Sequence, residues 1–503
     1  MYCQLEALRH CLPPSLRGIL EELPETLDET YERVLKEINK ANREHACRLL
    51  QCLTVALRPL RAEELAEVLA IDFAAPAHGG VPQLNPNWRW TDYQQAVLST
   101  CSSLITIVDD GDSQVVQFSH FSVKEYLTSN RLARSSLDVS RYHIALEPAH
   151  AVLAQACLGV LLRLDHRVIG DNIDETPLVG YASQHLLDHA RFEEVALHIR
   201  DAMEYFFDAD KPHWTAWSRV QKIDVRRRWF APFVGADDAL PLYYASLGGF
   251  YDLVEHLIGK RPECVNARGG QMAAPLVAAL HGKYFRIAEL LHRHGADVNV
   301  RSTSGRTLLH AACMTGSLDI VQWLLNHGAN VNTRSDMGSF PISSAVGRGH
   351  LQLVRMLLEF NADLDVRRDF GRGLLHIATN CLIDNHVGVM QLLLDHGANP
   401  NARDEVGSTP LHHSSWRKKG HSRPTWGSVE GTRLLLKYGA IIDAKDNKGR
   451  TPLQLAYKNY YQDIATCLIK HGAVGEASKL RVEQNRATRW SARQPPHLRT
   501  RTL

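Results

Sequence analysis

The 503-residue sequence has no G-x-x-x-x-G-K-[ST] phosphate-binding loop, no G-x-S-x-G hydrolase elbow and no H-E-x-x-H zinc motif. These motifs supply the phosphate cradle, the nucleophile or the metal of the enzymes that carry them. No Cys-His nucleophile signature is found either. We therefore expect a non-enzyme, with no catalytic residue, no cofactor and no bound metal.

Cysteine pairs, excess charge and long apolar runs are also missing. The ten cysteines form no C-x-x-C pair, and the formal net charge is +2. Scattered cysteines fit a reducing compartment, and near-neutral charge argues against a dedicated nucleic-acid binder. The best apolar stretch, residues 151–162, is too short to span a bilayer and is interrupted by Gln155. We expect a cytoplasmic protein that does not bind membranes.

A pattern recurs at nearly constant spacing from residue 240 onward, most clearly as Thr-Pro-Leu-His over residues 409–412. Its leucine or isoleucine returns at Leu242, Leu276, Leu309, Ile342, Leu375, Leu411 and Leu453. A Gly-Ala marker follows in most copies, at Gly295, Gly328, Gly397, Gly439 and Gly472. Asn361 replaces the glycine in the fourth copy, and asparagine tolerates the left-handed conformation of a helix end. The pattern resembles the ankyrin repeat and predicts seven repeats over 237–473.

Two features of the repeats are candidates for partner binding. An insertion in the sixth repeat holds a group of aromatic and basic residues, namely Trp416, Arg417, Lys418, Lys419, Arg423 and Trp426. The alternative interpretation is a tolerated surface loop. A ladder of basic residues in one register comprises Arg268, Arg301, Arg334, Arg367, Arg403 and Lys445. Aspartates that follow most of them favour a solvated edge, and contact with an acidic partner is the alternative.

The first part of the chain predicts a winged helix. Apolar residues recur at helical spacing in 21–40, and further helices are expected at 46–57, 61–70, 93–98 and 121–130. Two β-rich segments, 103–108 and 115–118, flank Asp-Asp-Gly-Asp, which indicates a hairpin. Residues 61–70 would lie in a DNA groove, but Glu63, Glu64 and Glu67 would repel phosphate there. We do not expect this domain to bind nucleic acid.

A helical connector is expected between the winged helix and the repeats. Aromatic residues gather in its second half, at Tyr205, Phe206, Phe207, Trp214, Trp217, Trp229, Phe230 and Phe233. Such density is typical of a core, so we expect it to pack on the first repeat. The tail from 474 is basic and poor in apolar residues, which predicts disorder. His412 and His413 have no further ligands nearby in the sequence, so a metal site is not expected.

The segments LPETLDETYERVL, RPLRAEELAEVLAIDF, LSTCSSLITIV and FSHFSVKEYL occur in that order within residues 1–165. Together they resemble the part of fungal NACHT–ankyrin proteins, of the NOD-like receptor type, that follows the NACHT ATPase. The winged helix of that part is of the GPI inositol-deacylase type. The resemblance implies that the chain is the carboxyl-terminal part of such a receptor, with the ATPase absent. It also implies that His120 matches a histidine that faces the bound nucleotide in complete receptors, although without an ATPase a buried histidine with a structural role is expected here.

The sequence thus predicts a mostly α-helical chain with a winged-helix domain, a helical connector and an ankyrin-repeat solenoid. The expected boundaries are 1–40 for a helical remnant, 41–135 for the winged helix, 136–236 for the connector, 237–473 for the repeats and 474–503 for the tail. The predicted function is that of a non-enzymatic scaffold that binds other proteins through the ankyrin surface, with a NACHT-containing chain as one candidate partner. A nucleic-acid-associated regulator that uses the winged helix and the basic tail is the alternative.

Overall fold

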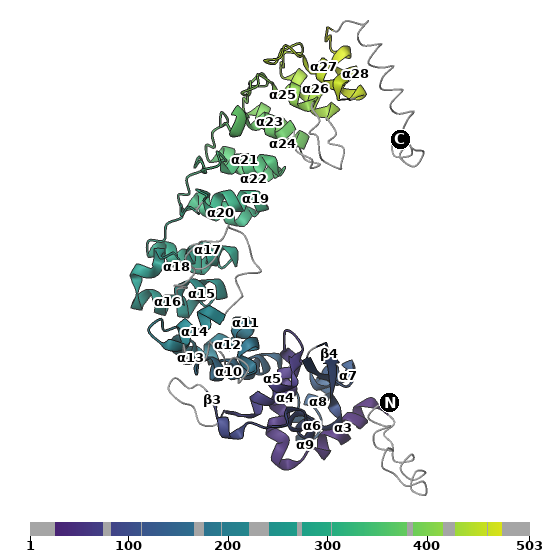
Figure 1. Cartoon of the computed structure of the whole chain (residues 1–503), viewed down its shortest axis with the longest axis vertical. Helices are drawn as coiled ribbons and strands as arrows, with labels where there is room; N and C mark the ends of the chain where they lie inside the picture. The colour runs from purple at the N-terminus through teal and green to yellow at the C-terminus, as the bar shows by residue number, and fades with distance from the viewer. Residues whose placement is uncertain are drawn as a thin grey trace. The chain divides into compact units, whose positions relative to one another are not determined.

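The computed structural model describes residues 26–73, 82–111, 113–164, 176–192, 194–220, 241–268, 274–302, 304–379, 386–415, 428–459 and 461–474. Most of these residues are helical, as the sequence predicts (Figure 1). They form two compact units that meet in the sequence between Ala296 and Asp297. No helix within the described ranges is both long enough and apolar enough to cross a membrane.

The first unit begins with the winged helix. Its helices are α3 (Leu27–Glu37), α4 (Arg43–Val55), α5 (Ala62–Leu69), α6 (Tyr93–Cys101) and α7 (Phe121–Leu127), with short 3-10 turns at Lys40–Asn42, Pro86–Trp88 and Ser102–Leu104. Strands β4 (Ile105–Asp110) and β5 (Ser113–Phe118) form the predicted hairpin, and Gly111 takes the positive φ that its turn needs. The sequence did not indicate β1 (Leu60–Arg61), which pairs with β5, or the short ribbon of β2 (Ile71–Asp72) and β3 (Gln83–Leu84). Strands of two residues carry too little periodicity to be recognised.

The connector continues from the winged helix within the same unit. Helices α8 (Asn130–Ala133) and α9 (Leu137–Ser140) end the winged helix, and the connector helices that follow are α10 (Leu146–Leu161), α11 (Leu178–Ala190), α12 (Val195–His198), α13 (Arg200–Phe206) and α14 (Pro212–Val220). Helices α10 and α11 pack side by side, with Leu153, Cys157 and Tyr181 fully buried.

The first two ankyrin repeats complete this unit, as α15 (Pro241–Gly248) with α16 (Tyr251–Lys260) and α17 (Pro275–His281) with α18 (Phe285–Arg293), separated by a 3-10 turn at Pro262–Asn266. The aromatic cluster packs on the first repeat as expected, since the Trp217 ring lies 5.1 Å from Tyr244 of α15. Arg191, the C-cap residue of α11, also donates to the carbonyl oxygen of Gly248, at 2.8 Å. The connector therefore covers the apolar end of the first repeat.

The second unit holds the other five repeats. Each has a first and a second helix, and the pairs are α19 (Leu308–Thr315) with α20 (Leu318–Asn326), α21 (Pro341–Gly347) with α22 (Leu351–Glu359), α23 (Leu374–Thr379) with α24 (His386–Asp395), α25 (Pro410–Ser414) with α26 (Val429–Lys437), and α27 (Pro452–Lys458) with α28 (Gln462–Lys470). First helices pack on first helices and second on second (Figure 1). Asn361 has a φ of 61°, so it does end its helix in the left-handed conformation.

Candidate protein-interaction surface

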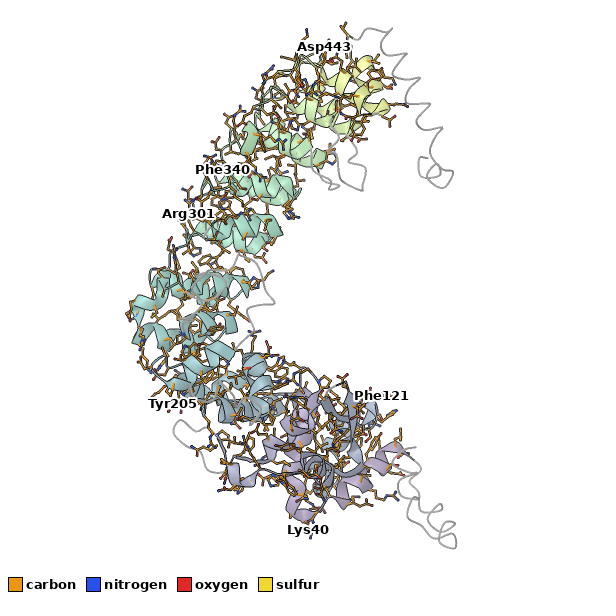
Figure 2. All side chains as sticks on the ribbon, in the orientation of Figure 1. Lys40, Phe121, Tyr205, Arg301, Phe340 and Asp443 are labelled. Atoms are coloured by element: carbon orange, nitrogen blue, oxygen red, sulfur yellow. The ribbon has the colours of Figure 1, made fainter. Side chains whose placement is uncertain are left out.

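The segments that join each second helix to the next first helix, here called tip loops, lie along one edge of the second unit. Arg301 and Phe340 mark this edge in Figure 2. Asparagines in the tip loops link neighbouring repeats. Asn299 donates to the carbonyl oxygen of Gly328 at 3.3 Å and accepts from the backbone of Asn330 at 2.8 Å. Asn332 and Asn401 repeat this pair of bonds one and three repeats later. The sequence analysis did not identify this linking role of the asparagines.

The basic ladder is exposed, but three of its guanidinium groups are held by the next repeat. Arg301 donates to the carbonyl oxygen of Arg334, and Arg403 donates to that of Lys445, each at 2.8 Å. Arg367 donates to the carbonyl oxygen of Arg403 at 2.8 Å and to the carbonyl oxygen of Gly371 at 3.0 Å. A freely solvated edge is therefore an incomplete description, because these side chains also tie repeat to repeat.

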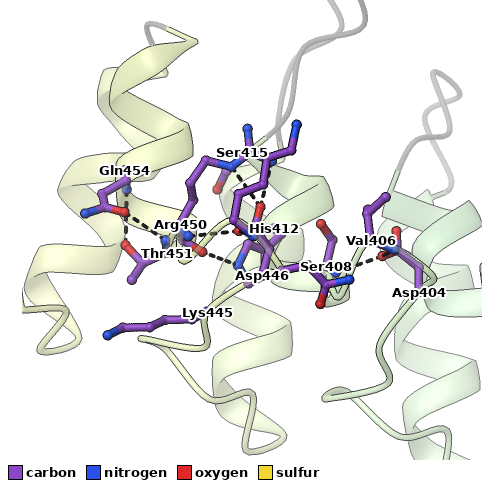
Figure 3. Close-up of polar contacts among 12 residues, drawn as sticks. Asp404, Val406, Ser408, His412, Ser415, Lys445, Asp446, Arg450, Thr451 and Gln454 are labelled. Carbon is purple, nitrogen blue, oxygen red and sulfur yellow. Dashed lines mark hydrogen bonds and ion pairs between the residues drawn. The ribbon is translucent and has the colours of Figure 1, made fainter.

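Two aspartates that were assigned to the solvated edge are buried instead. Asp404 and Asp446 are 7% and 5% exposed. The Asp446 carboxylate accepts the backbone N–H groups of Lys448 and Arg450 and pairs with the Arg450 side chain (Figure 3). Burial raises the pKa of Asp446, but these bonds lower it by more, so the net pKa lies below the ordinary value. These carboxylates close the tip loops of repeats six and seven.

The histidines at the Thr-Pro-Leu-His position of the pattern brace the repeats. His310 Nδ1 accepts the Thr307 N–H at 3.2 Å, and Nε2 donates to the Ser339 carbonyl oxygen of the next repeat at 3.1 Å. His376 and His412 make the equivalent pairs of bonds. Burial lowers the pKa of all three, that of His376 to about 4, so they are neutral at physiological pH.

His413 does have neighbouring ligand-type side chains, contrary to the expectation from the sequence. Ligand atoms of His376, Asp404 and His413 all lie within 4.8 Å of one another in a buried cluster. Asp404 and His413 belong to repeat six and are nine residues apart, and stacking on repeat five brings His376 close to them. Both His376 nitrogens are engaged by backbone groups, and His413 Nε2 donates to Asp404 at 2.8 Å. The residues present therefore do not fit a metal ion, which needs free lone pairs.

A pocket of about 350 Å³ opens between α19, α21 and the adjoining tip loops. Its lining includes three arginines, Arg306, Arg348 and Arg368, and two methionines, Met314 and Met337. None of the described lining residues is acidic. The sequence did not single out this group because its members come from three successive repeats.

The winged helix departs from the predicted charge pattern. Glu64 is fully buried and receives two bonds of 2.7 Å from Arg58, while Glu67 is 3% exposed, pairs with Arg89 and accepts the Leu178 N–H at 2.8 Å. Neither carboxylate faces solvent, so the argument that they would repel phosphate was wrong. Helical periodicity does not reveal that an acidic side chain is turned inward onto an arginine.

His120 is exposed, which corrects the expectation of a buried histidine. It caps α7, where Nδ1 accepts the Ser122 N–H at 3.3 Å, and its ring lies 4.3 Å from that of Phe121. Phe121 itself is 70% exposed. The insertion residues Trp416, Arg417, Lys418, Lys419, Arg423 and Trp426, the aromatics Trp229, Phe230 and Phe233, and the predicted basic tail lie outside the described residues, apart from residue 474.

Comparison with known proteins agrees with this architecture. Residues 31–139 match the GPI inositol-deacylase winged helix domain, residues 242–335 and 342–425 match the three-copy ankyrin repeat family, and residues 406–447 match the single ankyrin repeat. The chain is 33% identical over 279 residues to azaphilone pigments biosynthesis cluster protein L of Monascus ruber. The match covers 52% of this chain and 57% of that protein. The chain therefore combines a GPI inositol-deacylase-type winged helix with ankyrin repeats.

Proposed function

We propose that the chain is a non-enzymatic scaffold that binds other proteins through the ankyrin face formed by the tip loops and first helices. One observation carries the proposal: the pocket between α19 and α21 is lined by first helices and tip loops, together with Arg348 at the C-cap of α21. Stacked repeats place side chains from neighbouring units side by side, which creates an extended surface for a protein partner. Trp416 and Trp426 belong to the proposed surface on sequence grounds.

We further propose that this scaffold acts like the sensor and effector-binding half of a fungal NOD-like receptor, with a NACHT-containing chain as a candidate partner. The order of winged helix, connector and repeats supports this assignment. The relative from Monascus ruber is named as a protein of a biosynthesis cluster, and that name specifies no reaction.

Affinity capture of the tagged full chain, followed by quantitative mass spectrometry, tests the proposal. Met337→Glu changes the ankyrin face, and Leu318→Glu places the same charge on a second helix; the two side chains are 49% and 41% exposed. We expect a stoichiometric protein partner that is lost with Met337→Glu and kept with Leu318→Glu. Absence of any stoichiometric partner, or equal loss in both variants, would reject the ankyrin face as the binding surface.

A further inference from the structure

Three arginines of the pocket have no partner within the described part of the chain. The side chains of Arg306, Arg348 and Arg368 make no hydrogen bond or ion pair there. Arg306 and Arg368 are half-buried and Arg348 is exposed. Guanidinium groups that are partly withdrawn from water and unpaired favour an incoming anion, especially a planar carboxylate.

Comparison among the repeats shows that the fold does not require these charges. Arg368 stands seven residues before the pattern leucine, where repeats six and seven have the loop-closing Asp404 and Asp446. Arg450 stands three residues before its leucine and pairs with Asp446 at 2.6 Å. Arg306 occupies the same place in repeat three, but Ser302 replaces the aspartate. Repeats three and five therefore carry an arginine at one of these places without an aspartate beside it, whereas repeat seven pairs Arg450 with Asp446.

The apolar part of the pocket narrows the class of ligand. Met314 is half-buried and Met337 is 49% exposed, and both line the pocket among the arginines. Methionine adapts to irregular apolar side chains. The nearby carboxylate of Asp336 lies 3.7 Å from Arg301, which is not a lining residue. A mixed basic and apolar pocket suits a peptide better than a polyphosphate backbone, whose charges are regular and extended.

We propose that this pocket binds an acidic segment of a partner protein, in which clustered carboxylates flank an aliphatic side chain. Carboxylates would pair with Arg306, Arg348 and Arg368, and the aliphatic group would contact Met314 and Met337. The proposal rests on the scaffold function proposed above and specifies the chemistry of the partner.

Fluorescence anisotropy with the full chain tests the proposal. The probe is a fluorescein-labelled peptide that repeats glutamate-glutamate-leucine, and the matched peptide has glutamine in place of every glutamate. We expect Arg306→Gln, Arg348→Gln and Arg368→Gln each to weaken binding about fivefold or more, with a further loss as salt is raised. Arg355→Gln is the control, because Arg355 is exposed on α22 and does not line the pocket.

Equal binding of the two peptides, equal weakening by Arg355→Gln, or stronger competition by a single-stranded oligonucleotide of the same charge would overturn the proposal. So would failure of the glutamate peptide to bind. If the capture experiment still returns a partner that depends on Met337, the scaffold function stands and the acidic ligand alone is rejected. Circular dichroism of each arginine variant establishes that it is folded.

Discussion

His189 of α11 is held in the neutral state by its surroundings. Tyr181 Oη lies 2.7 Å from its Nε2, and its Nδ1 lies 2.8 Å from His150 Nδ1. Burial and the neighbouring His150 lower the pKa of His189 to about 3. A histidine in an unfolded chain has a pKa of about 6.5. Below that pH the unfolded chain takes up a proton that the native chain excludes, so acid favours unfolding.

We predict that the free energy of unfolding falls by about 1.4 kcal/mol as the pH is lowered from 7.5 to 5.5, because His189 is protonated only in the unfolded chain. Urea unfolding monitored by circular dichroism at both pH values measures this loss. His189→Gln should reduce the pH-dependent loss, because glutamine hydrogen-bonds without titrating. His198→Gln is the control: the His198 side chain is 60% exposed, and this variant should leave the pH-dependent loss of stability unchanged. The same pH dependence in wild type and His189→Gln would show that His189 is not responsible.

Residue roles were less predictable from the sequence than residue patterns. The pattern places a histidine close to the start of the first helix in several repeats, and that place determines the backbone partners of the side chain. The inward direction of Glu64 and Glu67 could not be predicted, since it depends on Arg58 and Arg89 from separate segments. The pocket arginines come from three repeats, and only the stacked structure brings them together.

At the scale of elements, Glu67 joins helix α5 of the winged helix to helix α11 of the connector. We predict that Glu67→Ala lowers the free energy of unfolding by about 2 kcal/mol, because Arg89 and the Leu178 N–H lose their buried partner. Glu67→Gln should recover part of this loss by accepting the Leu178 N–H. Glu63→Ala is the matched control on the same helix, since the Glu63 side chain is 27% exposed. If urea unfolding gave the same free energy of unfolding for all three variants, the proposed role of Glu67 would be contradicted.

The ladder arginines provide a second comparison at this scale. Arg367 donates to two carbonyl oxygens, whereas the Arg334 side chain makes no hydrogen bond to another described residue. We predict that Arg367→Met destabilises the second unit by about 1 kcal/mol and that Arg334→Met has a smaller effect. Hydrogen exchange of the tip loop at 400–409, measured by mass spectrometry, should rise for Arg367→Met. Equal hydrogen exchange in the two variants would show that the hydrogen bonds of Arg367 do not stabilise the contact between repeats.

Elements with strong periodicity were predictable from the sequence, and short ones were not. All seven helix pairs of the repeats are present, and the β4–β5 hairpin forms in the expected region, although residues 103–104 of the expected first strand lie in a 3-10 turn. Strand β1 was missed because two residues, Leu60 and Arg61, become a strand only by pairing with β5. Long-range pairing of this kind leaves no local signal.

At the scale of the whole molecule, the residues that hold the fold together differ from those that we propose bind a partner. The connector covers the first repeat through the contact of Trp217 with Tyr244, so that end needs no polar capping repeat. In the second unit, backbone and asparagine bonds hold the repeats together, which leaves the pocket arginines available for a ligand. Binding is thus proposed for side chains that the fold itself does not use.

Hydrogen exchange of the full chain, measured with and without a purified partner recovered by capture, tests the scaffold claim most directly. The account predicts slower exchange in the tip loops at 331–340 and 364–373 and at the end of α21, with α20 and α22 unchanged. Protection confined to the second helices or to the winged helix would contradict the claim that the ankyrin face binds the partner.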